Sequence, residues 1–234
     1  MISPLEKARK DPDSMKAKIL RVARRVFGEY GFHGTTTRLI AQETGIDIST
    51  LHYHWGDKAN LYEAVILDIT DDLKSELAEV EKIIHGLPLA KRMEIAIDVV
   101  TDYLFACPEI SNLILFRYFG KTRHEGTVDF HMPEFVSDIA RSMRLTESSK
   151  DVPVEARMKV LAMMNAIHNF ISGEEFFRSL LKLEKDAYVS RVKETLRFIL
   201  IPAFVSSEGK TRTVMSPSDE DPAGGWLWVN ERDH

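Results

Sequence analysis

The chain has 234 residues, 44% of them hydrophobic, a formal net charge of −5 and a single cysteine, Cys107. This size supports one large domain or two small ones, and one cysteine excludes an internal disulfide framework and a cysteine-rich zinc site. The N-terminus is charged where a secretory signal would be apolar, and no uncharged apolar run reaches the ~18 residues of a membrane span, so we expect a soluble, cytoplasmic protein.

The charge is unevenly distributed along the chain. Residues 1–60 hold ten Lys and Arg against seven Asp and Glu, a balance of +3, which leaves −8 for the rest of a chain whose total is −5. This asymmetry indicates a basic module joined to an acidic body, although a chance imbalance would look the same.

The spacing of apolar residues predicts helices nearly throughout, with no period-two run typical of strands and no internal repeat. A first helix follows a cap at Ser14 and ends near Gly31, a second ends at Gly45, and a third begins at about Asp47. A long amphipathic helix starts at Lys58, and Gly and Pro residues divide the chain after it into further helices. We therefore expect an all-α fold.

The stretch "GIDISTLHYHW", residues 45–55, decides the interpretation of the N-terminal part. At ~100° per residue, Ile48, Leu51 and Trp55 share one side of a helix and are expected to anchor it. The opposite side is formed by Ser49, Thr50 and Tyr53.

Two histidines lie on the flanks of this helix. His52 and His54 are ~160° apart around the axis, so they cannot bind one metal ion together, and we expect no metal site there. Before this helix, Ala41 is small enough for close helix contact and Gly45 permits a tight turn. This arrangement is typical of a helix-turn-helix, whose second helix enters the major groove of DNA.

The run "TTTRLIAQETGIDISTLHYHWGDKANLYEAV", residues 35–65, resembles the DNA-binding domain of the tetracycline-repressor (TetR) family of bacterial regulators. The shared features are the threonine-rich start, "IA", "TG", "STL", "HYHW", and then "K" and "LYEAV"; the preceding "FGEYGF" fits the end of the family's first helix. The resemblance covers roughly residues 14–65, about a quarter of the chain, and it is the ordered set that is specific.

The resemblance implies that the protein binds a double-stranded DNA operator. It assigns phosphate or base contacts to Thr37 and Arg38, a phosphate contact to Lys58, and groove-facing positions to the third helix; the full set is Thr37, Arg38, Ser49, Thr50, His52, Tyr53, His54 and Lys58. Two residues depart from the pattern: His52 stands where the family usually has tyrosine, and Ile48 stands where some members have a polar, base-reading residue. Taken alone, these side chains could be helix caps, an exposed aromatic ring and a solvated charge.

The resemblance also divides the chain into three regions. Residues 1–57 would form an N-terminal arm and the helix-turn-helix domain, residues 58–205 a helical ligand-binding and dimerisation domain, and residues 206–234 a polar tail. The resemblance also implies a homodimer that forms through the last two helices, about 154–182 and 185–205. Residues 160–171 are apolar around the whole helix, so we expect them to be buried on every side. These helices could instead form the core of a monomer.

A small-molecule effector is a further implication of the resemblance. Isolated polar residues on an apolar stripe of the helix at 154–182, with two aromatic residues on an earlier helix, could line its pocket: Phe116, Phe119, Met158, Asn165, His168, Asn169, Ser172 and Phe176. A buried hydrogen-bond network would give the same pattern.

The sequence thus favours a TetR-like transcriptional regulator, a ligand-responsive repressor that binds a palindromic operator as a homodimer. The alternative is a helix-turn-helix protein that binds a partner without reading DNA. We expect no enzyme and no cofactor, because the chain contains no Glu-x-x-His pair, no Gly-x-Ser-x-Gly elbow and no His-Glu-x-x-His helix.

Overall fold

The computed structural model describes residues 3–119, 132–146 and 151–205, and these ranges contain helices and no strands. The expected all-α fold is therefore confirmed. The helices of these ranges are α1 (Pro4–Lys10), α2 (Met15–Gly34), α3 (Thr37–Thr44), α4 (Ile48–Trp55), α5 (Lys58–Ile84), α6 (Leu89–Ala106), α7 (Pro108–Phe119), α8 (Met132–Ser142), α9 (Val154–Ser172), α10 (Glu174–Leu181) and α11 (Lys185–Val205). The tail at residues 206–234 lies outside them.

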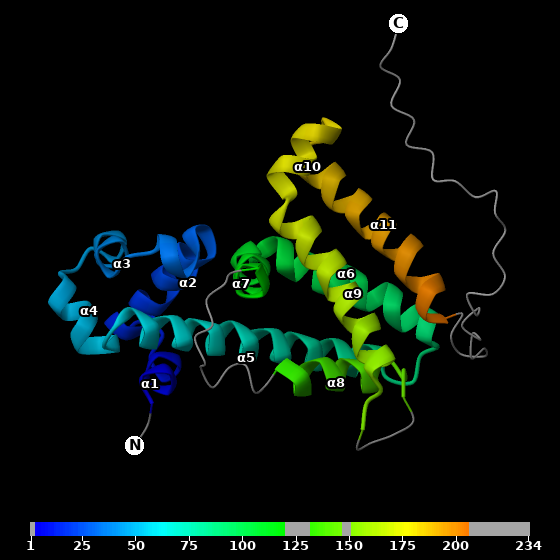
Figure 1. Cartoon of the computed structure of the whole chain (residues 1–234), viewed down its shortest axis with the longest axis horizontal. Helices are drawn as coiled ribbons and strands as arrows, with labels where there is room; N and C mark the ends of the chain where they lie inside the picture. Colours follow the sequence, from blue (N-terminus) through cyan, green and yellow to red (C-terminus); the bar gives the residue numbers. More distant parts are fainter. Residues whose placement is uncertain (1–2, 120–131, 147–150, 206–234) are drawn as a thin grey trace, which may run out of the picture.

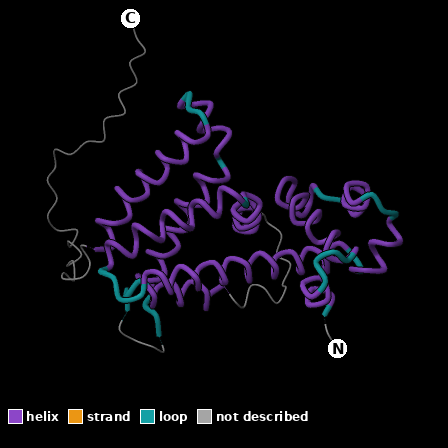
Figure 2. Tube along the Cα trace, turned by 180° about the vertical axis from the view of Figure 1, so that it is seen from behind, coloured by secondary structure: helices purple, strands orange, loops and turns teal. Residues whose placement is uncertain are grey.

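The molecule is elongated, and α5 runs along most of its length (Figure 1). At one end of α5 lie α1 to α4, and at the other lie α6, α8, α9, α10 and α11. The view from behind shows the same two groups joined by α5 (Figure 2). Only two residues separate the end of α4 from the start of α5.

Local sequence signals determine where the first helices begin and end. The Ser14 side chain caps α2 by accepting the amide of Ala17, and Gly31 interrupts the helical geometry near the end of α2 with φ of 67°. Gly45 ends α3 in the left-handed conformation, and Asp47 caps α4 by accepting the amide of Thr50. These predicted boundaries are confirmed.

The N-terminal residues form a docked helix rather than a free arm. Ser3 and Glu6 make a capping box at the start of α1, and Leu5 and Ala8 are buried. The Arg9 guanidinium bonds Asp68 at 3.0 Å and Asp71 at 2.8 Å, both on α5. Arg9 thus holds α1 against α5.

The helix expected at 154–182 is two helices, α9 and α10, separated at Gly173. A Cβ at this glycine would lie 2.4 Å from the Phe177 ring, so the close approach of the ring requires glycine there. The expectation that residues 160–171 are buried on every side includes the cover of a partner chain, so it stays a prediction. Within one chain α9 buries Val160 and Ile171, among others, whereas Ala162 is exposed, because neighbouring helices cover only one side.

Helix α7 packs between α2 and α9, and Figure 1 shows it end-on between the two groups. A Cβ at Gly28 of α2 would meet the Glu109 Cβ at 2.5 Å, so α2 and α7 are in close backbone contact. The Arg24 Nε bonds the Glu109 carboxylate at 3.0 Å, while its Nη1 bonds Asp68 and Asp72 of α5. This cluster connects α2, α5 and α7.

No single helix in the described ranges is long and apolar enough to cross a membrane. The segments Leu89–Ala106 and Pro108–Arg117 are together long and apolar enough to cross a membrane, but they form two helices at an angle of 91°. Their apolar residues, such as Leu104, Ile110 and Leu113, are buried in the protein core.

Candidate nucleic-acid interface and ligand cavity

The turn between α3 and α4 has the geometry of a helix-turn-helix. Gly45 has φ of 76°, which other residues rarely adopt, and the Ile46 amide donates to the Ala41 carbonyl at 3.0 Å. Ile40 and Leu51 are fully buried. The two short helices therefore share a core and hold a fixed relative orientation.

Helix α4 is anchored from below by two residues. Leu51 is fully buried and Trp55 nearly so, and the indole Nε1 donates to the Lys16 carbonyl of α2 at 3.2 Å. Ile48 is 37% exposed, so the expectation that it is a third buried anchor is wrong. Its place in the first turn, directly after the Asp47 cap, leaves it at the rim of the core.

The outer side of α4 is polar and aromatic. The Tyr53 side chain is 84% exposed, and Ser49 and His52 are exposed as well. Thr50 is half-buried, and its hydroxyl donates to the Asp47 carboxylate at 2.9 Å. These side chains belong to one short rigid helix, which is the form in which base-reading groups are presented to a groove.

The two histidines of α4 have different surroundings. His52 Nδ1 lies 2.6 Å from the Gly56 carbonyl, at the C-terminal end of the helix. His54 is half-buried, and burial together with the charge of Lys16 lowers its pKa. His54 therefore presents a neutral imidazole at pH 7, which can donate or accept a hydrogen bond but adds no charge to attract phosphate.

The start of α3 supplies further candidate contacts. Thr36 rather than Thr37 caps the helix, since its hydroxyl accepts the Leu39 amide at 3.1 Å. Thr37 is half-buried at the first helical position, and Arg38 is exposed. Because Thr37 is not the cap, its hydroxyl is available for another bond, and Arg38 projects a cation beside it.

Lys58 is placed differently from an extended surface lysine. Its ammonium donates to the carbonyls of Phe32 at 2.9 Å and Thr35 at 3.0 Å, and it lies 4.2 Å from the centre of the Phe32 ring. Lys58 thus fastens the start of α5 to the segment between α2 and α3. In this arrangement Lys58 supports the candidate interface by holding α5 against the end of α2 and the start of α3.

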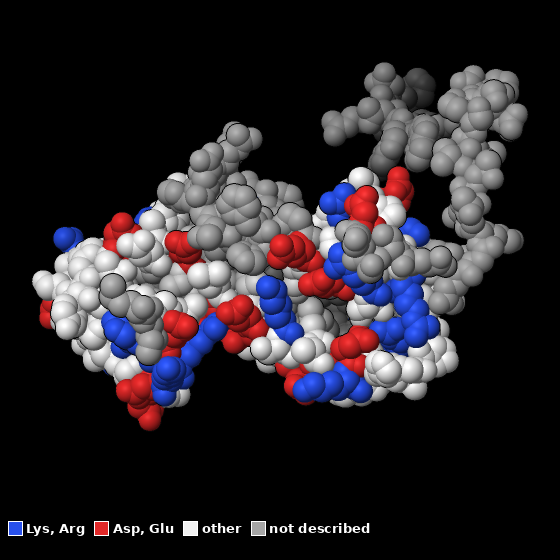
Figure 3. All heavy atoms as spheres, turned by 90° about the horizontal axis from the view of Figure 1, so that it is seen from below, with Lys and Arg blue, Asp and Glu red and all other residues white. Residues whose placement is uncertain are grey.

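Charged side chains are intermixed over the face seen from below (Figure 3). Acidic and basic groups alternate along the body, and the end that carries α3 and α4 is mainly uncharged in this view. The described residues contain no group of three or more His, Cys, Asp or Glu side chains that could hold a metal ion.

A cavity of about 470 Å³ lies among α5, α6, α8 and α9. His168 lines it, is buried, and shares a 3.0 Å hydrogen bond with Ser111 of α7. Burial lowers the pKa of His168 to about 4, so the imidazole is neutral at pH 7. The sequence left two interpretations of His168 open, a pocket residue or a member of a buried hydrogen-bond network. In the structure it lines the cavity and also makes a buried hydrogen bond.

The other described residues predicted to bind ligand do not line this cavity. Met158 and Phe176 are 59% and 67% exposed, and the Asn165 and Asn169 amides donate to carbonyls of their own helix. Ser172 is exposed, and Phe116 packs beside Gly31 of α2. The side chain of Phe119 lies outside the described residues.

The sequence interpretation missed a polar cluster on the cavity wall, formed by Glu81 of α5, Arg92 of α6 and Ser142 of α8. Arg92 could have been found, because it lies three residues after Leu89 and four before Ala96, on the apolar stripe of α6. A charged residue on such a stripe is rarely left unpaired.

Comparison with known proteins agrees with this geometry. Residues 19–65 match the sequence model described as "Bacterial regulatory proteins, tetR family". The chain carries a TetR-family DNA-binding domain. The match covers most of α2, all of α3 and α4, and the start of α5, and thus every residue of the candidate interface.

Relatives and solved structures extend the likeness beyond this TetR-family domain. An HTH-type transcriptional regulator of Staphylococcus aureus (strain USA300) is 24% identical over 76% of this chain and 96% of its own length. The HTH-type transcriptional repressor AcnR of Corynebacterium glutamicum is 28% identical over 40% of this chain and 55% of its own.

Two solved structures share the fold. A TetR-like transcriptional regulator from Rhodococcus sp. RHA1 has a TM-score of 0.56 at 20% identity, covering 79% of this chain and 93% of its own. The fatty acid degradation regulator FadR from Bacillus halodurans has a TM-score of 0.54 at 13% identity, and the match covers 79% of this chain and 95% of FadR.

Proposed function

We propose that the protein is a cytoplasmic transcriptional repressor that binds a palindromic DNA operator as a homodimer and is released by a small-molecule effector. The observation that carries the proposal is the exposed side of α4, where Tyr53 and its polar neighbours stand on a helix fixed by Leu51 and Trp55. The match to the TetR-family domain supports the DNA-binding part. Regulation by an effector rests on the cavity and its connections.

The DNA contacts follow from what each side chain can do. Arg38 and the Thr37 hydroxyl are suited to phosphate, while Ser49, His52, Tyr53 and His54 are suited to base edges in the major groove. Thr50 is engaged with the Asp47 cap and, with Lys58, contributes by holding the reading helix in place. One such head is small, so two heads on one palindrome supply affinity and register.

Dimerisation is supported by apolar side chains that one chain leaves uncovered. Phe198 of α11 is 80% exposed, and Phe176, Leu180 and Leu181 of α10 and Met158 of α9 are 56% to 67% exposed. Exposed apolar groups at this density mark an interaction surface. Pairing of α9, α10 and α11 with their copies would bury them.

A path from the cavity to the interface runs through α7. On one side Ser111 bonds His168, which lines the cavity, and two residues earlier Glu109 bonds Arg24 of α2. A ligand that displaces His168 therefore acts on the helix that carries the DNA-binding head. The shift requires that the ligand prefers one arrangement of the heads over the other.

The test is a comparison of wild type with Phe198→Glu by sedimentation equilibrium and by DNA titration. We expect the wild type to be a dimer and the variant to be a monomer with weaker DNA binding, with Ser190→Glu on the exposed side of α11 as the matched control. A monomeric wild type that binds DNA as tightly as the variant does would refute the dimeric part of the proposal.

A further inference from the structure

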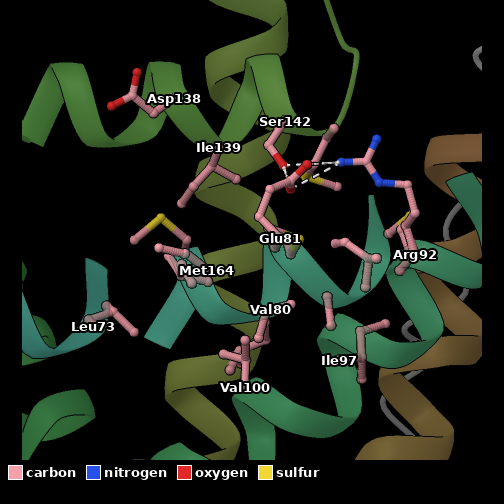
Figure 4. A pocket seen from close by; sticks show the side chains of 18 of the residues that line it. Leu73, Val80, Glu81, Arg92, Ile97, Val100, Asp138, Ile139, Ser142 and Met164 are labelled. Atoms are coloured by element: carbon pink, nitrogen blue, oxygen red, sulfur yellow. Dashed lines mark hydrogen bonds and ion pairs between the residues drawn. The ribbon is translucent and has the colours of Figure 1, made fainter. Parts of the chain in front are cut away.

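The cavity is almost entirely aliphatic. Its walls include Leu73, Val80, Ile97 and Val100, and Met164 completes one side (Figure 4). At about 470 Å³ it is roughly three times the ~150 Å³ cavity that accepts one benzene molecule, so it suits a ligand of about 18 non-hydrogen atoms. Methionines among these residues give the wall an adaptable shape.

One edge of the cavity is charged. Arg92 is only 6% exposed, and its Nη2 donates to both oxygens of Glu81, at 2.9 and 3.1 Å. Ser142 donates to the same carboxylate at 2.5 Å. Figure 4 shows the three side chains converging at the upper edge of the pocket, above the aliphatic wall.

This ion pair has two properties of an exchangeable site. The Arg92 Nε is buried and has no hydrogen-bond partner among the described residues, so one donor of the guanidinium is unsatisfied in this arrangement. The Glu81 side chain is 41% exposed, so it can turn to water at little cost, whereas Arg92 cannot. A buried guanidinium that loses Glu81 needs another anion in its place.

The composition of the wall discriminates between ligand charges. A carboxylate suits the planar fork of Arg92. A lipophilic cation would be repelled by Arg92 and would find the Glu81 and Asp138 carboxylates already paired with Arg92 and Arg141. It would also meet few aromatic faces, since Phe135 is the one Phe, Tyr or Trp on the described wall. An anionic head on an apolar body matches both parts of the cavity.

We propose that the cavity binds an amphipathic monocarboxylate whose carboxylate replaces Glu81 on Arg92. This inference gives the chemical class of the effector. Its regulatory role rests on the function proposed above, whereas binding of the carboxylate in the cavity does not. The exchange would also break the Glu81–Ser142 bond between α5 and α8, and α5 leads directly to the DNA-binding head.

Calorimetric titration of the full chain with dodecanoate and with 1-dodecanol at pH 7.5 tests this. We expect the carboxylate to bind at least about tenfold more tightly than the alcohol, as one charge-assisted hydrogen bond implies. Arg92→Gln should abolish that preference. Equal affinity of the wild type for the two probes would overturn the proposal.

Glu81→Gln provides a second test, which leaves the Arg92 side chain itself in place. Removal of the competing anion should strengthen dodecanoate binding by about tenfold and leave dodecanol unchanged, whereas Glu79→Gln on the same helix, paired with Lys82 at the surface, should change neither. If Glu81 serves structure alone, Glu81→Gln will lower stability without any gain in carboxylate affinity, and the proposal fails.

Two further controls separate binding in the cavity from binding elsewhere on the protein. Ala96→Phe, which places a ring in the cavity, should abolish binding, whereas adsorption to the exposed apolar surface of α10 and α11 would persist and would refute a cavity site. DNA binding is measured in parallel without ligand. Selective DNA binding with no carboxylate preference overturns this inference alone, while carboxylate binding without DNA binding overturns the proposed function alone.

Discussion

Replacement of Lys58 by methionine separates two roles of this side chain. The variant retains the apolar stem but loses the hydrogen bonds to the Phe32 and Thr35 carbonyls, at 2.9 and 3.0 Å, and the contact with the Phe32 ring. A hydrogen bond from a charged group contributes ~1.5–3 kcal/mol and a cation–π contact ~0.5–1 kcal/mol. Because the side chain is half-buried, we discount the sum to roughly 2–4 kcal/mol of unfolding free energy.

At ~2–4 °C per kcal/mol for a chain of this size, the melting temperature should fall by roughly 5–15 °C. Thermal unfolding followed by circular dichroism measures it, with Lys18→Met at an exposed position of α2 as control. A DNA titration at several salt concentrations completes the test. An unchanged melting temperature with a salt slope flatter by about one unit would show that the ammonium binds phosphate instead, and would refute the structural role.

Three other predictions follow from exposure, packing and burial. Tyr53→Ala should leave stability within about 0.5 kcal/mol but change which sequences are preferred in a competition assay; a uniform loss of affinity would argue against a base-facing ring. Gly28→Ala places a Cβ 2.5 Å from that of Glu109 and should destabilise the fold by ~1–3 kcal/mol in denaturant unfolding, despite a gain in helix propensity; a more stable variant would show that α2 and α7 separate freely. Burial lowers the pKa of His168 from 6.5 to about 4, so the unfolded chain takes up the proton first and stability is lost as pH falls from about 6.5 to 4, by on the order of 3 kcal/mol. Unfolding curves of His168→Gln should lack that loss, and parallel pH profiles of the two proteins would contradict the assignment.

The N-terminal part could be predicted closely because its signals are local. Ser14, Gly45 and Asp47 each determine a helix end through their own backbone or side chain, and such effects act within a few residues. The angular position of Leu51, Trp55 and Tyr53 followed from helical periodicity. Ile48 was misjudged because a helical wheel assumes that the protein core extends along the whole helix.

The cavity could not be predicted from the sequence, because its walls come from four helices that are distant in sequence. Met158, Asn165 and Phe176 share a stripe with His168 in an unbroken helix, but the break at Gly173 and the limited cover of α9 place them elsewhere. Pairing of Arg92 with Glu81 and Ser142 depends on tertiary contacts between α5, α6 and α8. The role of Lys58 could not be predicted either, because its partners are backbone carbonyls. Every residue has such a carbonyl, so the sequence does not show which of them lie near the lysine.

The central claim is that α4 reads DNA sequence in a dimer. Selection of bound duplexes from a random pool by the purified protein, followed by titration of the enriched duplex at two salt concentrations, tests it most directly. We expect an inverted repeat and an affinity that falls with salt by a log–log slope of ~0.9 per phosphate contacted. A pool without enrichment in the absence of any ligand, together with binding insensitive to salt, would contradict the claim.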